Sequence, residues 1–247
     1  MLDPLIEIRK IKDVDLKGGI VIDGFPSVGL ANAIASECLV NSLKTEFVAV
    51  IDSPNFSAMS VIRNAAPNFP ARIYANEELK LGIFVSELYL DQSMYRPIAR
   101  TILQWTLEHK CELVISAAGV PYDETEMPTS DAGLKVYGAG STSSALKRLA
   151  DAGIEKLVSG SVTGIPAILL NEGAWSNLDV IVLLVKVLKD APDFRAAAAV
   201  SESLSKLAPG ASCDIGSLLK EAELVEKSLK HLRSGQASGA LRDEMYG

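Results

Sequence analysis

The chain has 247 residues, of which 48% are hydrophobic and 22% charged, so it can bury a sizeable core as one large domain or two small ones. A formal net charge of -7 leaves no basic surface for a phosphate backbone, and nucleic acid is not expected as a partner. Residues 1–4 carry an acid and a proline where a secretory signal would be basic, and the longest apolar run, 180–188, falls short of the ~20 residues of a membrane helix. We therefore expect a soluble, cytoplasmic protein without membrane contact.

The first half of the chain predicts a strand, a turn and a helix, followed by two further strands. Residues 19–24 form a short apolar run bounded by glycines, and Ser27 follows as the predicted N-cap of a helix that reaches Leu43. Apolar runs at residues 47–51 and 81–85 each end in polar residues, which is typical of buried strands.

The second half alternates helices with strands. Helices are predicted at residues 93–109, 143–152, 165–172 and 193–207, and strands at 113–117, 156–162 and 178–187. Strands separated by helices predict an α/β fold with a mostly parallel sheet that helices cover on both faces.

Three cysteines, Cys38, Cys111 and Cys213, are scattered along the chain. They form no CxxC pair, and no group of cysteines and histidines has the spacing of zinc ligands, which argues against a disulfide framework and against a zinc site. We expect all three to be reduced and structural.

Residues 121–140 are predicted to form a long loop rich in proline, glycine and acid. Loops of this length are often functional, but solvated acidic loops are equally common, and both interpretations stay open. Asp123, Glu124, Glu126 and Asp131 have the carboxylates that a divalent cation prefers, yet their spacing matches no known loop motif, so no metal is expected.

The C-terminal region divides into a helix and a tail after a domain that spans residues 1–212. Residues 213–233 predict an amphipathic helix, which packs either on the domain or at a subunit interface. Its apolar seam consists of Leu218, Ala222, Val225, Leu229 and Leu232. Residues 234–247 begin with small residues and predict a flexible tail.

The turn at residues 24–29 has the glycine spacing of a phosphate-binding loop but lacks its chemistry. Leu30 and Ala31 stand where lysine and Ser/Thr would reach phosphate and magnesium, and Pro26 replaces the second glycine of a dinucleotide fingerprint. The glycines are therefore interpreted as packing residues, and neither ATP nor another cofactor is expected. The two histidines, His109 and His231, have no nucleophile nearby in the sequence.

Four segments resemble successive motifs of the proteasome assembly chaperone 2 family. They are residues 24–32, residues 119–121 with 135–138, residues 162–170, and residues 192–199, and the resemblance spans roughly residues 18–225. It implies a three-layer sandwich similar to the phosphorylase/hydrolase fold, a homo-oligomer such as a trimer or tetramer, and a role in assembly or regulation of the proteasome core. It implies no catalytic residue. Candidate pocket or interface residues within these motifs are Gly24, Phe25, Pro26, Gly29 and Tyr137.

The last three residues, Met245, Tyr246 and Gly247, resemble the tripeptide of a hydrophobic residue, tyrosine and any residue by which proteasome activators dock between α-subunits of the core particle. The resemblance implies that the α-subunits are the partner of this tripeptide. It makes Met245, Tyr246 and Gly247 the candidate partner-binding residues.

A second hypothesis treats the phosphorylase-like fold as that of an enzyme. The turn at residues 24–29 and the loop at residues 121–140 would then line a nucleoside or phosphate pocket. Fold similarity alone is a weak reason for this activity, because function depends on the site.

Overall fold

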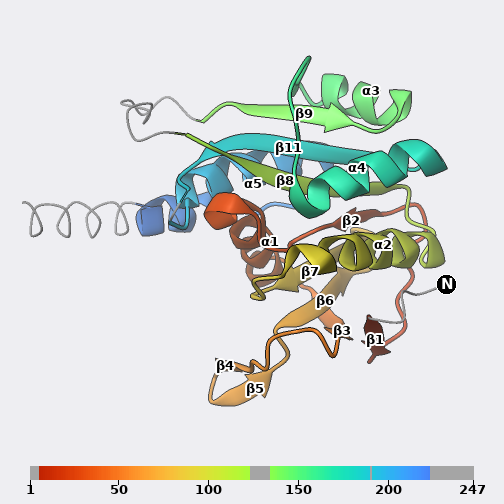
Figure 1. Ribbon diagram of the computed structural model, residues 1–247, viewed down its shortest axis with the longest axis vertical. Coiled ribbons are helices and arrows are strands. Elements are labelled where there is room, and N and C mark those ends of the chain that lie inside the picture. Colours follow the sequence, from red (N-terminus) through yellow and green to blue (C-terminus); the bar gives the residue numbers. More distant parts are fainter. Residues whose placement is uncertain (1–5, 123–133, 190, 223–247) are drawn as a thin grey trace, which may run out of the picture.

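The computed structural model describes residues 6–122, 134–189 and 191–222 (Figure 1). Its strands are β1 (Glu7–Lys10), β2 (Ile20–Ile22), β3 (Glu46–Asp52), β4 (Val61–Arg63), β5 (Ala66–Asn68), β6 (Ala71–Asn76), β7 (Leu81–Ser86), β8 (Leu113–Pro121), β9 (Val136–Gly140), β10 (Glu155–Lys156) and β11 (Asp179–Val187). Its helices are η1 (Val28–Leu30), α1 (Ala31–Ser42), α2 (Gln92–Glu108), α3 (Ser143–Asp151), α4 (Gly164–Ser176) and α5 (Phe194–Leu207), and residues 215–222 are also helical.

The alternation of side chains along β11 explains the three layers. Val180 and Val182 belong to one buried apolar cluster, whereas Ile181 and Leu183 belong to another on the opposite face. A strand that is apolar on both faces needs cover on both. Helices α2 and α4 cover one face of the sheet, and α1, α3 and α5 cover the other (Figure 1).

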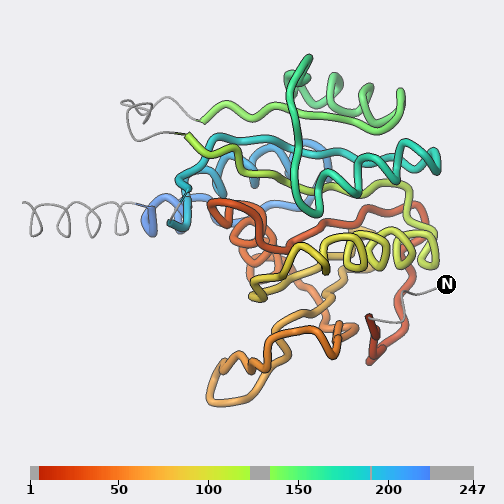
Figure 2. The backbone as a smooth tube through the Cα atoms, in the orientation of Figure 1, coloured from red at the N-terminus to blue at the C-terminus, as the bar shows by residue number. Residues whose placement is uncertain are grey.

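Within the described residues the main sheet has nine strands in the order β1-β3-β6-β7-β2-β8-β11-β9-β10. Its centre, β7-β2-β8-β11, is parallel, and β1, β3, β6 and β9 join by antiparallel pairing. The predicted α/β three-layer fold is confirmed, and the antiparallel strands extend it at both sides. Helices α1 and α5, from opposite ends of the sequence, lie side by side (Figure 2).

Two local predictions need correction. The predicted strand at residues 156–162 is reduced to β10, because the chain leaves the sheet after Leu157 and exposes 97% of Val158. The predicted N-cap Ser27 does precede a helix, but its Oγ makes no capping bond, and the short helix η1 intervenes before α1.

The prediction that all cysteines are reduced is wrong. Cys38 on α1 and Cys213 form a disulfide with their Cα atoms 5.6 Å apart, although they are separated by 175 positions in the sequence. Local spacing gives no sign of such a pair, because only the packing of the C-terminal region on α1 brings the two residues together. Cys111 stays a free thiol, and burial raises its pKa to about 11.

The C-terminal helix is described only over residues 215–222. Leu218 and Ala222, the first two positions of the predicted apolar seam, are buried, and Leu218 joins the cluster beneath α1 and α5. The rest of the seam and residues 234–247 lie outside the described part of the chain, so the division at residues 212 and 233 stays a prediction. In the described part, no helix is long and apolar enough to cross a membrane.

Candidate functional site

The turn that follows β2 is fixed by two buried polar side chains. Asp23 accepts a hydrogen bond from the Phe25 backbone N–H at 2.9 Å and another from the Ser116 hydroxyl at 2.7 Å. Asn32 of α1 donates to the Phe25 carbonyl oxygen at 3.1 Å and accepts from the Ala117 N–H at 3.1 Å. The turn is thereby tied to α1 and to β8, which gives Asn32 a structural role within the first family motif.

Burial perturbs the carboxyl group of Asp23. Desolvation raises its pKa from 3.8 to about 6, against the hydrogen bonds from Phe25 and Ser116, which favour the ionised form. A perturbed carboxyl can mark an active site. Asp23 is fully buried, however, and lines neither of the two cavities described below, so we assign it to holding the turn.

The glycines of the turn are packing residues, as the sequence predicts. A Cβ added to Gly24 would lie 2.1 Å from the Phe84 carbonyl oxygen. Gly29 has a φ of 72°, and a Cβ there would lie 2.5 Å from the Cβ of Val187. The Gly29 carbonyl also accepts from the Asp193 N–H at 2.8 Å, which joins the turn to the start of α5.

We expect Gly29→Ala to lower the free energy of unfolding by about 1–3 kcal/mol more than Gly153→Ala, because only the first forces a side chain against Val187. Gly153 is a matched control, since its φ of 67° is similar but an added Cβ would meet nothing within 4 Å. Urea unfolding of the two variants measures the difference, and equal losses would show that the contact with Val187 is unimportant.

The other sequence-predicted residues are not gathered into one pocket. Phe25 is buried in the core, and Pro26 lines both cavities described below. Tyr137 lies on β9 and lines neither cavity; the Nζ of Lys135 lies 4.9 Å from the centre of its ring. The candidates Met245, Tyr246 and Gly247 lie outside the described residues.

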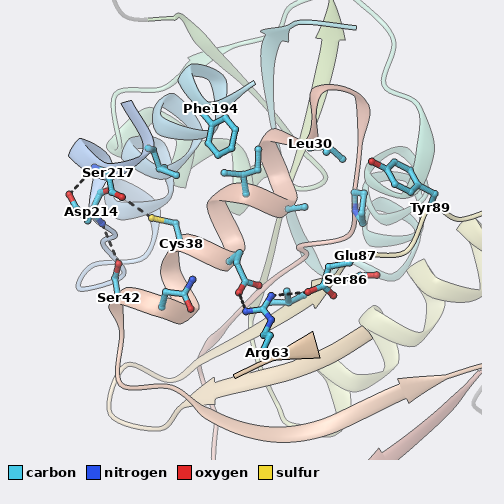
Figure 3. A pocket seen from close by; sticks show the side chains of 17 residues that line it. Leu30, Cys38, Ser42, Arg63, Ser86, Glu87, Tyr89, Phe194, Asp214 and Ser217 are labelled. Atoms are coloured by element: carbon cyan, nitrogen blue, oxygen red, sulfur yellow. Dashed lines mark hydrogen bonds and ion pairs between the residues drawn. The ribbon is translucent and has the colours of Figure 1, made fainter. Parts of the chain in front are cut away.

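The larger cavity, here called the α1 cavity, has a volume of about 720 Å³ and lies against the outer face of α1 (Figure 3). Its apolar lining includes Pro26, Leu30, Ile34, Val85, Phe194 and Leu218. Cys38 lines it as well, at the side where residues 214–218 cross α1. A volume in this range is typical of ligand pockets.

An ion-pair cluster closes one end of the α1 cavity (Figure 3). Arg63 of β4 pairs with Glu37 of α1 and, at 2.8 Å, with Glu87. The buried Arg72 of β6 donates to the Phe69 carbonyl and pairs with Glu87 at 2.7 Å. The hydrogen bond to Glu37 is the main reason why the pKa of Arg63 is raised. Sequence analysis missed this cluster, because its four members come from separate elements.

The smaller cavity, here called the edge cavity, has a volume of about 550 Å³ and lies at the carboxyl edge of the parallel strands. Residues 26–30 and Pro121 line it together, whereas residues 24–25 and the described residues 134–140 of the predicted loop do not. Of its described lining residues only Lys189 is charged. The acidic residues Asp123 to Asp131 lie outside the described part, and within that part no group of three His, Cys, Asp or Glu side chains could hold a metal ion.

The position of His109 beside a helix end predicts a favourable charge at the helix C-terminus, and His231 is expected at the surface. His109 follows α2, where its ring stacks on Trp105 with 3.9 Å between ring centres and its Nδ1 lies 2.9 Å from the Trp105 carbonyl oxygen. These contacts hold the end of α2 against its own last turn. His231 lies outside the described residues.

Comparison with known proteins gives consistent matches along nearly the whole chain. A model of the PAC2 family matches residues 21–233. PbaA of Pyrococcus furiosus, described as an archaeal homologue of proteasome-assembly chaperone, is 30% identical and superposes with a TM-score of 0.80 over 97% of this chain and 99% of its own.

Two further relatives agree with this match. PbaB of Pyrococcus furiosus, described as an archaeal proteasome activator, is 22% identical, with a TM-score of 0.76 over 92% of this chain and 98% of its own, which shows a shared fold. An uncharacterised protein of Methanocaldococcus jannaschii is 26% identical over 232 residues, which is 94% of this chain and 92% of its own.

Proposed function

Because the chain belongs to the PAC2 family, we propose that it is a cytoplasmic proteasome assembly chaperone or activator that binds the α-ring of the core particle through its C-terminal tripeptide. The observation that carries the proposal is the match to PbaA over 97% of the chain. It joins the independent resemblance of Met245, Tyr246 and Gly247 to a docking tripeptide. The family resemblance seen in the four internal motifs is confirmed.

Each residue of the tripeptide supplies a different contact in the proposed complex. The terminal carboxylate of Gly247 accepts a charge-assisted hydrogen bond from a lysine in the α-subunit pocket. Tyr246 fills a partly polar slot with its ring and hydroxyl, and Met245 adds an adaptable apolar contact. The core particle thus recognises a free C-terminus and not a folded surface.

The tail and the oligomer make this weak contact effective. Treated as a flexible chain, the ~11 residues from 234 to 244 span roughly 17–20 Å, enough to carry the tripeptide away from the domain surface. In the proposed homo-oligomer, a trimer or tetramer, several tails reach one ring. The gain in affinity through effective concentration is on the order of 10²- to 10⁴-fold.

Native gels of the protein mixed with proteasome core particles test the proposal. Wild type and Arg242→Ala, a change within the tail but outside the tripeptide, are expected to shift the core particle. Tyr246→Ala and deletion of residues 245–247 are expected to leave it unshifted, because both remove contacts that every copy needs. Equal shifts by all four proteins would disprove docking by the tripeptide.

A further inference from the structure

The disulfide between Cys38 and Cys213 joins α1 to the start of the C-terminal region. Cys38 is half-buried and lines the α1 cavity, so a reagent that enters this cavity reaches the bond. Cys213 is half-buried too, and stands immediately before the helix at residues 215–222. The bond therefore lies at the start of residues 212–222, the last described segment of the chain.

Few other contacts hold residues 212–222 in place. Between residues 212 and 222 only Leu218 and Ala222 are buried, and the Asp214 N–H donates to the Ser42 hydroxyl at 3.3 Å. Most of the intervening side chains are exposed. The disulfide is consequently the strongest tie between this segment and α1.

The remaining cysteine, Cys111, is a buried free thiol and not part of a disulfide. Cys111 is buried, donates weakly to the Leu16 carbonyl, and its pKa is raised to about 11 by burial. A buried thiol of high pKa is inert toward exchange. Of the three cysteines, only Cys38 and Cys213 are therefore expected to take part in thiol–disulfide exchange.

We propose that Cys38 and Cys213 form a reversible redox site, which a dithiol reductant opens and which controls whether residues 212–222 stay attached to α1. A disulfide in a cytosolic protein is commonly transient or redox-sensing, which favours reversibility over a fixed bond. Residues 212–222 are held against α1 when the bond is oxidised and are released when it is reduced. The consequence of this change for the tail rests on the proposed function. The reversibility of the bond rests on it as well, through the cytosolic location, whereas the position of the bond beside the α1 cavity does not.

The exchange reaction has two steps. A thiolate of the reductant attacks Cys38 Sγ through the α1 cavity, the disulfide breaks, and Cys213 leaves as a thiolate. The second thiol of the reductant then attacks the mixed disulfide and releases Cys38. Two electrons pass to the protein, the reductant becomes a disulfide, and its two protons are taken up by Cys38 and Cys213.

Hydrogen–deuterium exchange of the full chain, measured without core particles, tests this site. The native protein is compared before and after treatment with dithiothreitol. Thiols are counted in both states by alkylation after the reductant is removed and the protein is unfolded in denaturant, so that the buried Cys111 also reacts. We expect one thiol before and three after reduction, and on the order of tenfold faster exchange at residues 212–222 on reduction, with little change in α2. Removal of the reductant should restore slow exchange.

Two variants make the test specific. Cys213→Ser should exchange fast at residues 212–222 with or without dithiothreitol, whereas Cys111→Ser should respond like wild type. A disulfide that dithiothreitol reduces only after denaturation, or exchange that is the same in both redox states, would overturn the proposal. Because no core particle is present, neither result depends on whether the tail docks.

Discussion

Replacing Arg72 by methionine is expected to lower the free energy of unfolding by about 2–3 kcal/mol, because it removes a buried donor from a partly buried carboxylate. The Arg72 side chain is 1% exposed and lies 2.7 Å from Glu87 Oε1. Glu87 Oε2 is buried and has no hydrogen-bond partner among the described residues. Without Arg72, the Glu87 carboxylate, whose side chain is 30% exposed, loses its closest charged donor and keeps Arg63 at 2.8 Å.

Arg63→Met is the matched control for Arg72→Met. Arg63 pairs with the same oxygen of Glu87 at 2.8 Å, but 37% of its side chain is exposed. Solvent screens such a pair, and we expect a loss of about 1 kcal/mol or less. Urea unfolding measures both variants. Equal losses would contradict the view that burial decides the contribution of each arginine, and adding Glu87→Gln to Arg72→Met should recover part of the stability.

Asp23→Asn is expected to remove a pH-dependent change of about 3 kcal/mol in the free energy of unfolding, at 1.36 kcal/mol for each pKa unit. The pKa of Asp23 is raised from 3.8 to about 6 by burial, so the folded state binds its proton more tightly than the unfolded state. The contribution of this carboxyl to stability is therefore fully present below pH 3.8 and is lost as the pH rises through about 6. Asparagine does not ionise and keeps an oxygen that accepts from the Phe25 N–H.

Urea unfolding of wild type and Asp23→Asn between pH 4 and pH 7.5 checks this expectation. The stability of the variant relative to wild type should rise with pH and level off near pH 7. Ser116→Ala provides a control, because it removes a hydrogen bond that lowers the pKa of Asp23 and should move the transition to higher pH. A stability difference that does not vary with pH would contradict the assignment.

The strands that the sequence predicts well are those with unbroken apolar runs. Strands β2, β7, β8 and β11 form the parallel centre of the sheet and are buried on both faces, so their composition is mostly apolar. The turn after β2 was also predictable, because its glycines follow an apolar run at close spacing. In the structure, these glycines meet backbone or side-chain atoms closely enough to forbid a Cβ.

Two flanking strands, β6 and β9, were missed for identifiable reasons, whereas the flanking strand β3 was predicted at residues 47–51. Strand β6 contains Arg72 in the middle of its apolar residues, and only the cluster with Glu87 makes that burial acceptable. Strand β9 contains Gly138 and Gly140, which weaken a strand prediction. A Cβ added to Gly138 would lie 2.4 Å from Leu149 Cδ2, so the glycine there is required by the close approach of α3.

The features of the candidate site also differ in how far apart their residues lie in the sequence. The proposed docking tripeptide and the glycine turn are each contiguous in the sequence, so both could be proposed from it. The disulfide and the ion-pair cluster depend on residues that only the tertiary structure brings together, with Cys38 and Cys213 separated by 175 positions. No spacing rule would have paired them.

The affinity of the protein for isolated proteasome core particles tests the central claim most directly. Binding curves are measured for the full chain and for a chain that ends at Glu244, with oligomeric state checked to be the same for both. We predict that removal of Met245, Tyr246 and Gly247 weakens binding by on the order of 10²-fold or more, because every tail loses its contact at once. Equal affinity of the two chains, or no binding by either, would contradict it.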